Sequence, residues 1–356
     1  MTRFRLEQRV EPSTAGRYAG YAVAVGLAGC MGGIVFLLVG ANPLTAYTVM
    51  ARGAFGSLHD LSEIVVKAIP LMLCGLAVGV AAKIQVWNVG GEGQLVLGGI
   101  GAAGVALFLA PRVPPSLVLP LVVAAGFLAG ALWAFLAGIL RTTLGVNEIL
   151  TTLMLNYVAI YWVEHLYFGP WRDPMGMGFP GTAILPEVAW LPRLPGTRIH
   201  LGLALALLAA VLLQAVLSRT RWGYEMRVIG ENEQAARYAG MPIQRTILWV
   251  MCLSGGLAGL AGMTEVSGIH YRLQQGLAVG YGYTGIIVAW LARLHPGGIV
   301  LAALFLASLL VGGDQLQAVM HLPSAVGLVL EGALLFCVLG SDLFSRYRLR
   351  WWTSRA

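Results

Sequence analysis

The stretch from residue 115 to residue 140 reads PSLVLPLVVAAGFLAGALWAFLAGIL and contains no charged side chain. The hydrocarbon layer of a membrane is about 30 Å thick, and roughly 20 helical residues cross it. A run this long and this apolar would leave a large hydrophobic surface if it lay on a soluble protein. The stretch therefore predicts a transmembrane helix.

Composition extends this prediction to most of the chain. Of its 356 residues, 58% are hydrophobic and 11% are charged, whereas about a quarter of an average soluble domain is charged. The apolar residues gather in ten runs, which cover residues 19–40, 61–82, 89–110, 115–140, 145–168, 199–217, 243–266, 280–293, 297–312 and 323–343. We therefore predict an all-α fold, a polytopic transmembrane helical bundle. Two of the runs, 280–293 and 297–312, are short enough for re-entrant or half-helices.

Positive charge gives the predicted orientation. With a cytoplasmic N-terminus and ten alternating segments, sixteen of the 23 lysines and arginines fall in cytoplasmic segments and six in external ones. Such an excess is typical of the cytoplasmic side of a membrane. We therefore predict a multi-pass protein of a bacterial inner membrane with both termini in the cytoplasm. Its predicted parts are a cytoplasmic segment (1–18), a transmembrane domain (19–343), which includes an external loop (169–198) and a cytoplasmic loop (218–242), and a cytoplasmic tail (344–356).

Several classes of site find no support in the sequence. The four cysteines lie singly inside apolar runs, so neither a disulfide framework nor a metal site is indicated. The net charge of +7 is spread over the ends of the apolar runs, which does not suggest a nucleic-acid partner. Lys67 and Lys83, the only lysines, stand outside any Gly-Lys-Ser/Thr phosphate loop. The chain therefore cannot be its own P-loop ATPase.

The cytoplasmic loop 218–242 carries signals for a short helix. Asn232 suits the N-cap, the residues from Glu233 to Ala239 favour helix, Gly240 suits a left-handed C-terminal position, and Pro242 ends the helix. A helix in a loop between membrane segments suggests a docking surface for another protein. The alternative is a solvated charged loop without a partner.

Polar residues also occur at the starts of two apolar runs. An ionised carboxylate inside a bilayer costs about 2.5–3.5 kcal/mol on insertion scales, so such groups usually face a cavity or a partner. The residues are a candidate translocation path, and the alternative is that they cap helix N-termini. They are Asn88, Glu92, Gln94, Asn147, Glu148 and Asn156.

Four ordered segments resemble one known family. Arg227-Val-Ile-Gly-Glu-Asn-Glu-Gln-Ala-Ala-Arg-Tyr-Ala-Gly-Met241 is similar to the coupling loop of ABC importer permeases for branched-chain amino acids, simple sugars and nucleosides. Val86-Trp-Asn-Val-Gly-Gly-Glu-Gly-Gln-Leu95 resembles a segment of the nucleoside and simple-sugar branch. Asn147-Glu-Ile-Leu-Thr-Thr-Leu-Met-Leu-Asn156 and Gly280-Tyr-Gly-Tyr-Thr-Gly-Ile-Ile-Val-Ala289, the latter followed by Arg293-Leu-His-Pro-Gly297, match two further signatures.

The resemblance implies the permease subunit of an ATP-driven importer, a transport subunit without catalytic residues. Its expected partners are a separate ABC ATPase, which would use ATP and Mg, a second and homologous permease, an extracytoplasmic substrate-binding protein and membrane lipid. The chain itself would bind no cofactor, and its solute would be a nucleoside or a simple sugar. The residues expected to couple it to the ATPase are Glu231, Glu233, Ala235, Ala236, Arg237 and Gly240.

Two other functions stay open at this point. An ion-coupled secondary transporter would use membrane carboxylates, for which Glu92, Glu148, Glu265 and Glu331 are candidates. The loop at 227–241 argues against it. A membrane-embedded enzyme has the least support, because the polar loops show no paired carboxylates, Ser/His set or metal-ligand spacing.

Overall fold

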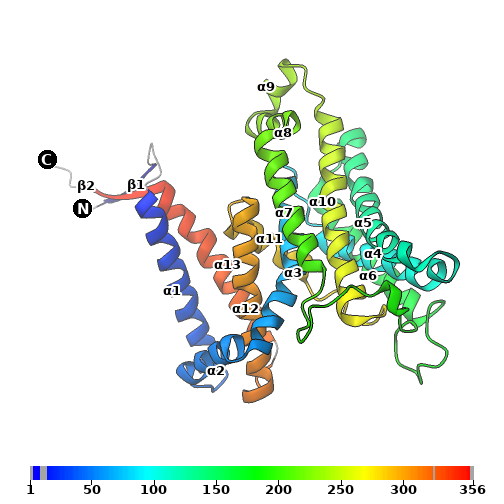
Figure 1. The fold of residues 1–356 in the computed structure, drawn as a ribbon. Coiled ribbons are helices and arrows are strands. Elements are labelled where there is room, and N and C mark those ends of the chain that lie inside the picture. Colours follow the sequence, from blue (N-terminus) through cyan, green and yellow to red (C-terminus); the bar gives the residue numbers. More distant parts are fainter. Residues whose placement is uncertain (1–2, 9–13, 324, 353–356) are drawn as a thin grey trace. The chain divides into compact units, whose positions relative to one another are not determined.

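The computed structural model describes residues 3–8, 14–323 and 325–352, and in these residues the chain is mostly helical (Figure 1). The predicted all-α membrane bundle is confirmed. The longer helices are α1 (Thr14–Leu38), α2 (Pro43–Phe55), α3 (Leu58–Ala82), α4 (Gly91–Gly104), α5 (Pro115–Leu144), α6 (Glu148–Phe168), α7 (Gly202–Arg219), α8 (Arg221–Glu231), α10 (Ile243–Glu265), α11 (Tyr281–Leu291), α12 (Pro296–Met320) and α13 (Ala325–Arg346). A short helix, α9 (Glu233–Tyr238), follows α8.

Two terminal strands are the extended elements of the described chain. Strand β1 (Arg3–Gln8) pairs antiparallel with β2 (Tyr347–Trp352), with Arg3 opposite Trp352. They lie in the segments 1–18 and 344–356, which the sequence assigns to the cytoplasm. Parts of both segments, 1–2, 9–13 and 353–356, lie outside the described residues.

Each of the ten predicted membrane runs contains a helix, but fewer than ten helices of the described residues could span a membrane by length and composition alone. Six described helical stretches meet that test, and α1 with α2, bent by 114°, makes a seventh if the pair is one span. The predicted number of ten membrane segments is therefore only approximate. The six stretches are Leu58–Ala82, Gly91–Arg112, Pro115–Leu144, Gly202–Arg219, Ile243–His270 and Pro296–Met320.

Three details differ from the sequence prediction. The run at 297–312 was predicted to be short, but α12 has 25 residues and is long enough to span. Helix α2 was not predicted, although Asn42 caps it by accepting a hydrogen bond from the Leu44 N–H at 2.9 Å and Pro43 occupies its first turn. Helix α8 was not predicted either, and it fills the first half of the loop 218–242.

The chain divides into two compact units. One contains Leu61–Ala307, and the other contains Met1–Asp60 with Ser308–Ala356. In the second unit α1 packs along α13, and a buried cluster fills the space between its helices. That cluster is Phe36, Ala46, Met50, Leu316, Leu322, Val326 and Leu330.

Glycines form the contacts at the centre of the larger unit, where α4, α5 and α10 pack together. A Cβ atom at Gly259 of α10 would collide with the carbonyl oxygen of Gly126 on α5. A Cβ at Gly98 of α4 would collide with the Gly259 carbonyl, and one at Gly262 with that of Leu95. Membrane helices often pack through small residues because no hydrophobic force draws them together in lipid. The backbones of these three helices therefore touch directly.

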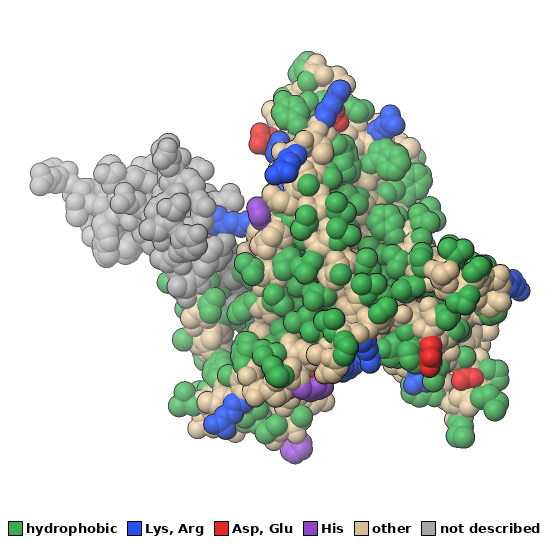
Figure 2. All heavy atoms as spheres, in the orientation of Figure 1, with side chains coloured by type: hydrophobic (Ala, Val, Ile, Leu, Met, Phe, Trp, Pro, Cys, Tyr) green, Lys and Arg blue, Asp and Glu red, His purple; other side chains and the backbone are tan. Residues whose placement is uncertain are grey.

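The two ends of the larger unit differ. Helices α8 and α9 lie at one end of α7 and α10, and the loop 169–198 lies at the other (Figure 1). That loop is not one helix, as its prolines predict, and it pairs with the segment after α10: the N–H of Leu185 donates to the Tyr271 carbonyl at 2.8 Å, and that of Leu191 to the Ser267 carbonyl at 2.9 Å. Hydrophobic side chains cover the flank of α7 and α10, and charged ones gather near their ends (Figure 2).

Candidate functional site

Helices α8 and α9 form a continuous segment with a cap at each joint. The Thr220 hydroxyl accepts a hydrogen bond from the Gly223 N–H at 3.1 Å and so caps α8. The Asn232 side chain accepts one from the Ala235 N–H at 3.0 Å and caps α9. Gly240, with φ of 72°, is left-handed. The predicted N-cap and left-handed glycine of the short helix are both confirmed.

The predicted coupling residues lie together on this segment, and most of them are exposed. Glu233 and Arg237 form an ion pair at 3.0 Å one turn apart on α9. Ala236 is buried, whereas Glu231, Ala235 and Gly240 are exposed. Tyr238, which the sequence analysis did not single out, is 94% exposed. The exposed surface of α9 therefore carries an ion pair and an aromatic ring side by side.

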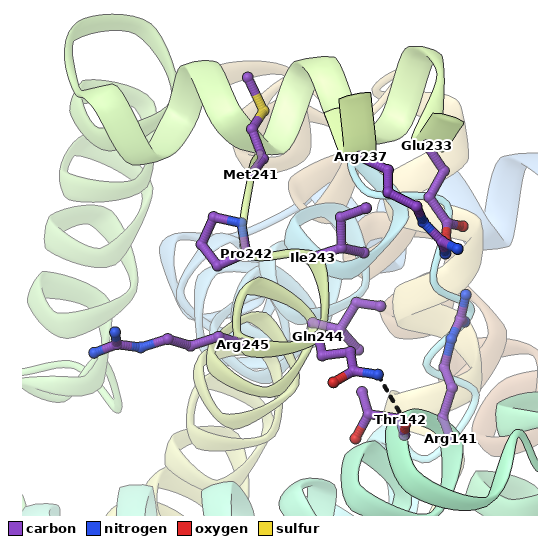
Figure 3. Close-up of a pocket in the computed structure, with 10 residues that line it drawn as sticks. Arg141, Thr142, Glu233, Arg237, Met241, Pro242, Ile243, Gln244 and Arg245 are labelled. Atoms are coloured by element: carbon purple, nitrogen blue, oxygen red, sulfur yellow. Dashed lines mark hydrogen bonds and ion pairs between the residues drawn. The ribbon is translucent and has the colours of Figure 1, made fainter. Parts of the chain in front are cut away.

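A hollow of about 560 Å³ lies beside α9 (Figure 3). Glu233 and Arg237 lie on its α9 side, and Arg141 and Thr142 at the end of α5 lie across from them. The Gln244 side chain donates to the Thr142 carbonyl at 3.4 Å, which joins the start of α10 to α5. The hollow also has Met241, Pro242, Ile243, Arg245 and Ile247 in its lining. Sequence reasoning did not find it, because α5 and α9 are far apart in the chain.

Helix α8 packs against the turn that follows α3. A Cβ at Gly230 would collide with the carbonyl oxygen of Lys83 and lie 3.5 Å from the Cα of Ile84. Burial, and secondly the charge of Arg227, lower the pKa of Lys83 from its ordinary value. Arg227 itself donates to the Leu217 carbonyl at 2.8 Å. The segment is therefore packed onto the backbone that leads to α4.

Asn88 and Gln94 form a buried amide pair at the start of α4. Asn88 Nδ2 donates to Gln94 Oε1 at 2.8 Å, and Gln94 Nε2 donates to Asn88 Oδ1 at 2.8 Å. Asn88 Nδ2 also donates to Ser254 Oγ at 2.7 Å, and the Ser254 hydroxyl donates to the Ala77 carbonyl at 2.6 Å. The pair joins the loop before α4 to α3 and α10.

Glu92 and Asn156 connect three helix segments. The Glu92 carboxylate accepts the N–H of Gly280 at 2.8 Å and that of Gly282 at 2.7 Å, both at the start of α11. Asn156 on α6 accepts from the Gly93 N–H at 2.8 Å and donates to the Val89 carbonyl at 3.0 Å and to Tyr283 Oη at 3.1 Å. Glu92 and Asn156 are 1% and 0% exposed.

The other two candidates for the translocation path lie elsewhere. Asn147 caps α6 by accepting the N–H of Ile149 at 2.9 Å. Glu148 forms an ion pair with Arg141 at the end of α5 and accepts the N–H of Trp87 at 3.3 Å. The structure thus brings together four of the six predicted residues, Asn88, Glu92, Gln94 and Asn156. All six make contacts at helix ends, and contact with a solute stays a prediction.

The carboxylates named for ion coupling have separate partners. Glu92 binds backbone N–H groups of α11, Glu148 binds Arg141, and Glu265 lies 3.5 Å from His270. Glu331 belongs to the other unit. Across residues 3–8, 14–323 and 325–352, no group of three or more His, Cys, Asp or Glu side chains could hold a metal ion.

Comparison with known proteins identifies the family of the chain. The family described as the permease component of the branched-chain amino acid transport system matches residues 61–339. The glucose ABC transporter permease protein TsgB13 of Haloferax volcanii is 36% identical over 90% of this chain and 86% of its own. The guanosine ABC transporter permease protein NupP of Bacillus subtilis is 34% identical over 86% of this chain and 87% of its own.

A third relative, the nucleoside ABC transporter permease protein NupB of Lactococcus lactis, is 31% identical over 86% of this chain and 86% of its own. The family match covers the helices that hold Asn88, Glu92, Gln94 and Asn156, and it covers the α8–α9 segment. The chain therefore belongs to the permease family of the branched-chain amino acid transport system and is a membrane permease subunit of an ABC importer.

Proposed function

We propose that this permease is driven by a separate ABC ATPase that docks on the α8–α9 segment. The observation that carries the proposal is the exposed, capped helix α9, with the Glu233–Arg237 pair and Tyr238 on its surface. Charged side chains at the rim of an interface direct which partner binds and how it is oriented. The hollow beside α9 offers a second surface of the same segment.

The partner would bind ATP and Mg and carry out hydrolysis, and this chain would convert its movement into alternating access. The ordinary architecture of such an importer also needs a second permease and an extracytoplasmic substrate-binding protein. Helix α7, with apolar side chains such as Leu208 and Val211 exposed along its length, offers a surface for lipid or for another membrane subunit.

We propose a nucleoside or a simple sugar as the solute. The relatives are named for glucose, guanosine and nucleosides. These solutes share a ring that carries several hydroxyl groups, so hydrogen-bonding side chains in the pathway would suit them. Asn88 and Gln94 supply amides at the start of α4, and Asn156 supplies one from the middle of α6.

The location proposed is a bacterial inner membrane, with residues 1–18, 218–242 and the tail in the cytoplasm. Reporter fusions at Ala356 and within residues 175–190 are expected to give cytoplasmic and external signals respectively, because positive residues concentrate on the cytoplasmic side. A cytoplasmic signal from residues 175–190 would overturn this topology and remove α8–α9 from the side where ATP is available.

The docking role can be tested on two α9 variants. At Gly240 φ is 72°, and a β-branched residue there is strained by roughly 1–2 kcal/mol. Gly240→Val is therefore expected to displace α9, abolish transport and weaken association with the ATPase. Glu233→Arg is expected to abolish transport and weaken association with the ATPase as well, because it reverses a charge at an exposed site of α9. Uptake, membrane abundance and ATPase co-purification are measured together.

A matched control comes from another left-handed glycine. Gly196, with φ of 76°, lies in the loop at the opposite end of the unit, and a Cβ there meets nothing within 4 Å. Gly196→Val carries similar strain and is expected to keep ATPase association. If Gly240→Val and Glu233→Arg both transport at the parental rate, α9 is not the docking helix.

A further inference from the structure

We propose that Glu92 is a positioning residue, a carboxylate clamp that fastens helix α11 to helix α4 so that both move as one body during transport. The clamp consists of Glu92, Gly280 and Gly282. The carboxylate oxygens Oε1 and Oε2 each accept one backbone N–H, from Gly280 at 2.8 Å and from Gly282 at 2.7 Å. The inference rests on the proposed transport function and assigns Glu92 a role other than contact with solute.

Helix α11 lacks a cap of its own. Its N-cap residue is Gly280, which has no side chain to accept a hydrogen bond. The first N–H groups of any helix lack partners within the helix and need an acceptor when they are buried. A carboxylate is the strongest such acceptor, and its charge also suits the positive end of the helix dipole. Glu92 provides this cap from a different helix.

Backbone packing holds the same two helix starts together. A Cβ at Gly91 would lie 3.4 Å from the Cα of Gly282, and a Cβ at Gly282 would lie 2.5 Å from the carbonyl carbon of Gly91. Glu92 is itself the second residue of α4, so its carboxylate lies near the N-termini of both helices. The contact is thus formed by the first turns of α4 and α11.

The segment before α11 explains why a clamp is needed. Gly276 and Gly280 have φ of 93° and 95°, and the residues between them form no helix. With 11 residues, α11 is about 16 Å long, roughly half the thickness of the hydrocarbon layer. The backbone that precedes α11, with its two left-handed glycines, does little to fix the direction of this half-helix. The Glu92 carboxylate supplies that restraint.

The clamp is also connected to the proposed docking segment. Helix α8 packs through Gly230 on the carbonyl of Lys83, nine residues before Glu92. The backbone from Lys83 to Gly90 leads directly into α4, and Asn88 fixes it by accepting the Gly90 N–H at 3.0 Å. Movement of α8 would therefore reach α4 through this loop, and the clamp would pass it on to α11.

Glutamine at position 92 keeps the size of the side chain and removes the second acceptor. Its amide oxygen can accept one N–H, but its NH₂ group then faces the other N–H. Glu92→Gln is expected to lower solute transported per ATP hydrolysed about tenfold, while membrane abundance and ATPase association stay parental. Loss of a charge-assisted hydrogen bond should also speed amide exchange at Gly280 and Gly282 about tenfold or more.

The experiment uses the full transporter, with its ATPase, in lipid nanodiscs for hydrogen–deuterium exchange and ATP hydrolysis, and in proteoliposomes for uptake. Hydrogen–deuterium exchange of peptides that cover residues 276–285 is measured beside uptake and ATP hydrolysis, with peptides of α10 as the internal reference. Glu92→Asp keeps the charge on a shorter side chain and is expected to restore part of both the exchange protection and the transport. Glu164→Gln, which removes a carboxylate from the far end of α6, is expected to leave both at the parental level.

Three results would overturn the clamp. One is parental transport and exchange in Glu92→Gln. Another is a raised KM for solute with unchanged exchange at 276–285, which would make Glu92 a solute contact. If the Glu92→Gln protein does not accumulate in the membrane, Glu92→Asp becomes the test. The third result is then parental exchange at residues 276–285 in Glu92→Asp. If the parental protein shows no ATP-dependent uptake, the proposed function fails, and faster exchange in the Glu92 variants still supports the clamp.

Discussion

Replacing Gly262 by leucine is expected to prevent the accumulation of folded protein in the membrane. Any Cβ at this position would collide with the carbonyl oxygen of Leu95 on α4 and lie 2.9 Å from the backbone N of Gly99. Both are backbone atoms, so no side chain can rotate away. Overpacking typically costs about 1–3 kcal/mol, and here whole helices must separate, so we expect a loss at or above the upper value.

The measurement is the amount of monodisperse protein after detergent extraction, together with its thermal midpoint. Gly262→Ala should lower both less than Gly262→Leu does. The matched control is Gly26→Leu in α1, where a Cβ meets nothing within 4 Å. It should leave both quantities near the parental values. If Gly262→Leu behaves like Gly26→Leu, the direct backbone contact between α4 and α10 is wrong.

Replacing Gly230 by valine is expected to abolish transport while the ATPase still binds. A Cβ there would collide with the Lys83 carbonyl, so α8 would have to leave the turn after α3. The surface of α9 would be preserved, since Glu233, Arg237 and Tyr238 are exposed and lie outside that contact. Movement of the ATPase would then no longer reach the loop before α4. The variant therefore separates docking from transmission.

Uptake and ATPase co-purification are measured on the same membranes. Arg221→Val places the same β-branched side chain on α8 where the side chain is 92% exposed, and the ion pair it loses is worth about 0.3–0.5 kcal/mol. This control should transport near the parental rate. Parental uptake by Gly230→Val would show that α8 does not act through the turn at Lys83.

Local signals explain what could be predicted. The N-cap of α9 and its left-handed end depend on Asn232 and Gly240, which act on residues next to them in the chain. The ten apolar runs likewise all contain helices, because length and hydropathy are local properties. Helix α8 was missed because charged side chains such as Arg221 and Arg227 interrupt it, and its buried face consists of Gly223, Met226 and Ile229.

Long-range contacts explain what could not be predicted. Glu92 was placed correctly near a helix start, but its partners lie 188 and 190 residues away in the chain. Gly259 and Gly262 pack against Gly126 and Leu95, and no signal near them in the sequence identifies these neighbours. The end of α12 was missed because Asp314 and Gln315 stop the apolar run, whereas the helix continues to Met320.

Reconstitution tests the central claim most directly. The purified permease is placed in proteoliposomes together with the second permease and the substrate-binding protein, with and without the ATPase partner, and uptake of radiolabelled guanosine and glucose is measured with ATP or with an imposed proton or sodium gradient. The account predicts uptake of at least one of these solutes with the ATPase and ATP together, none when either is omitted, and loss of uptake in Gly240→Val. Uptake without the ATPase, driven by an ion gradient, would contradict it.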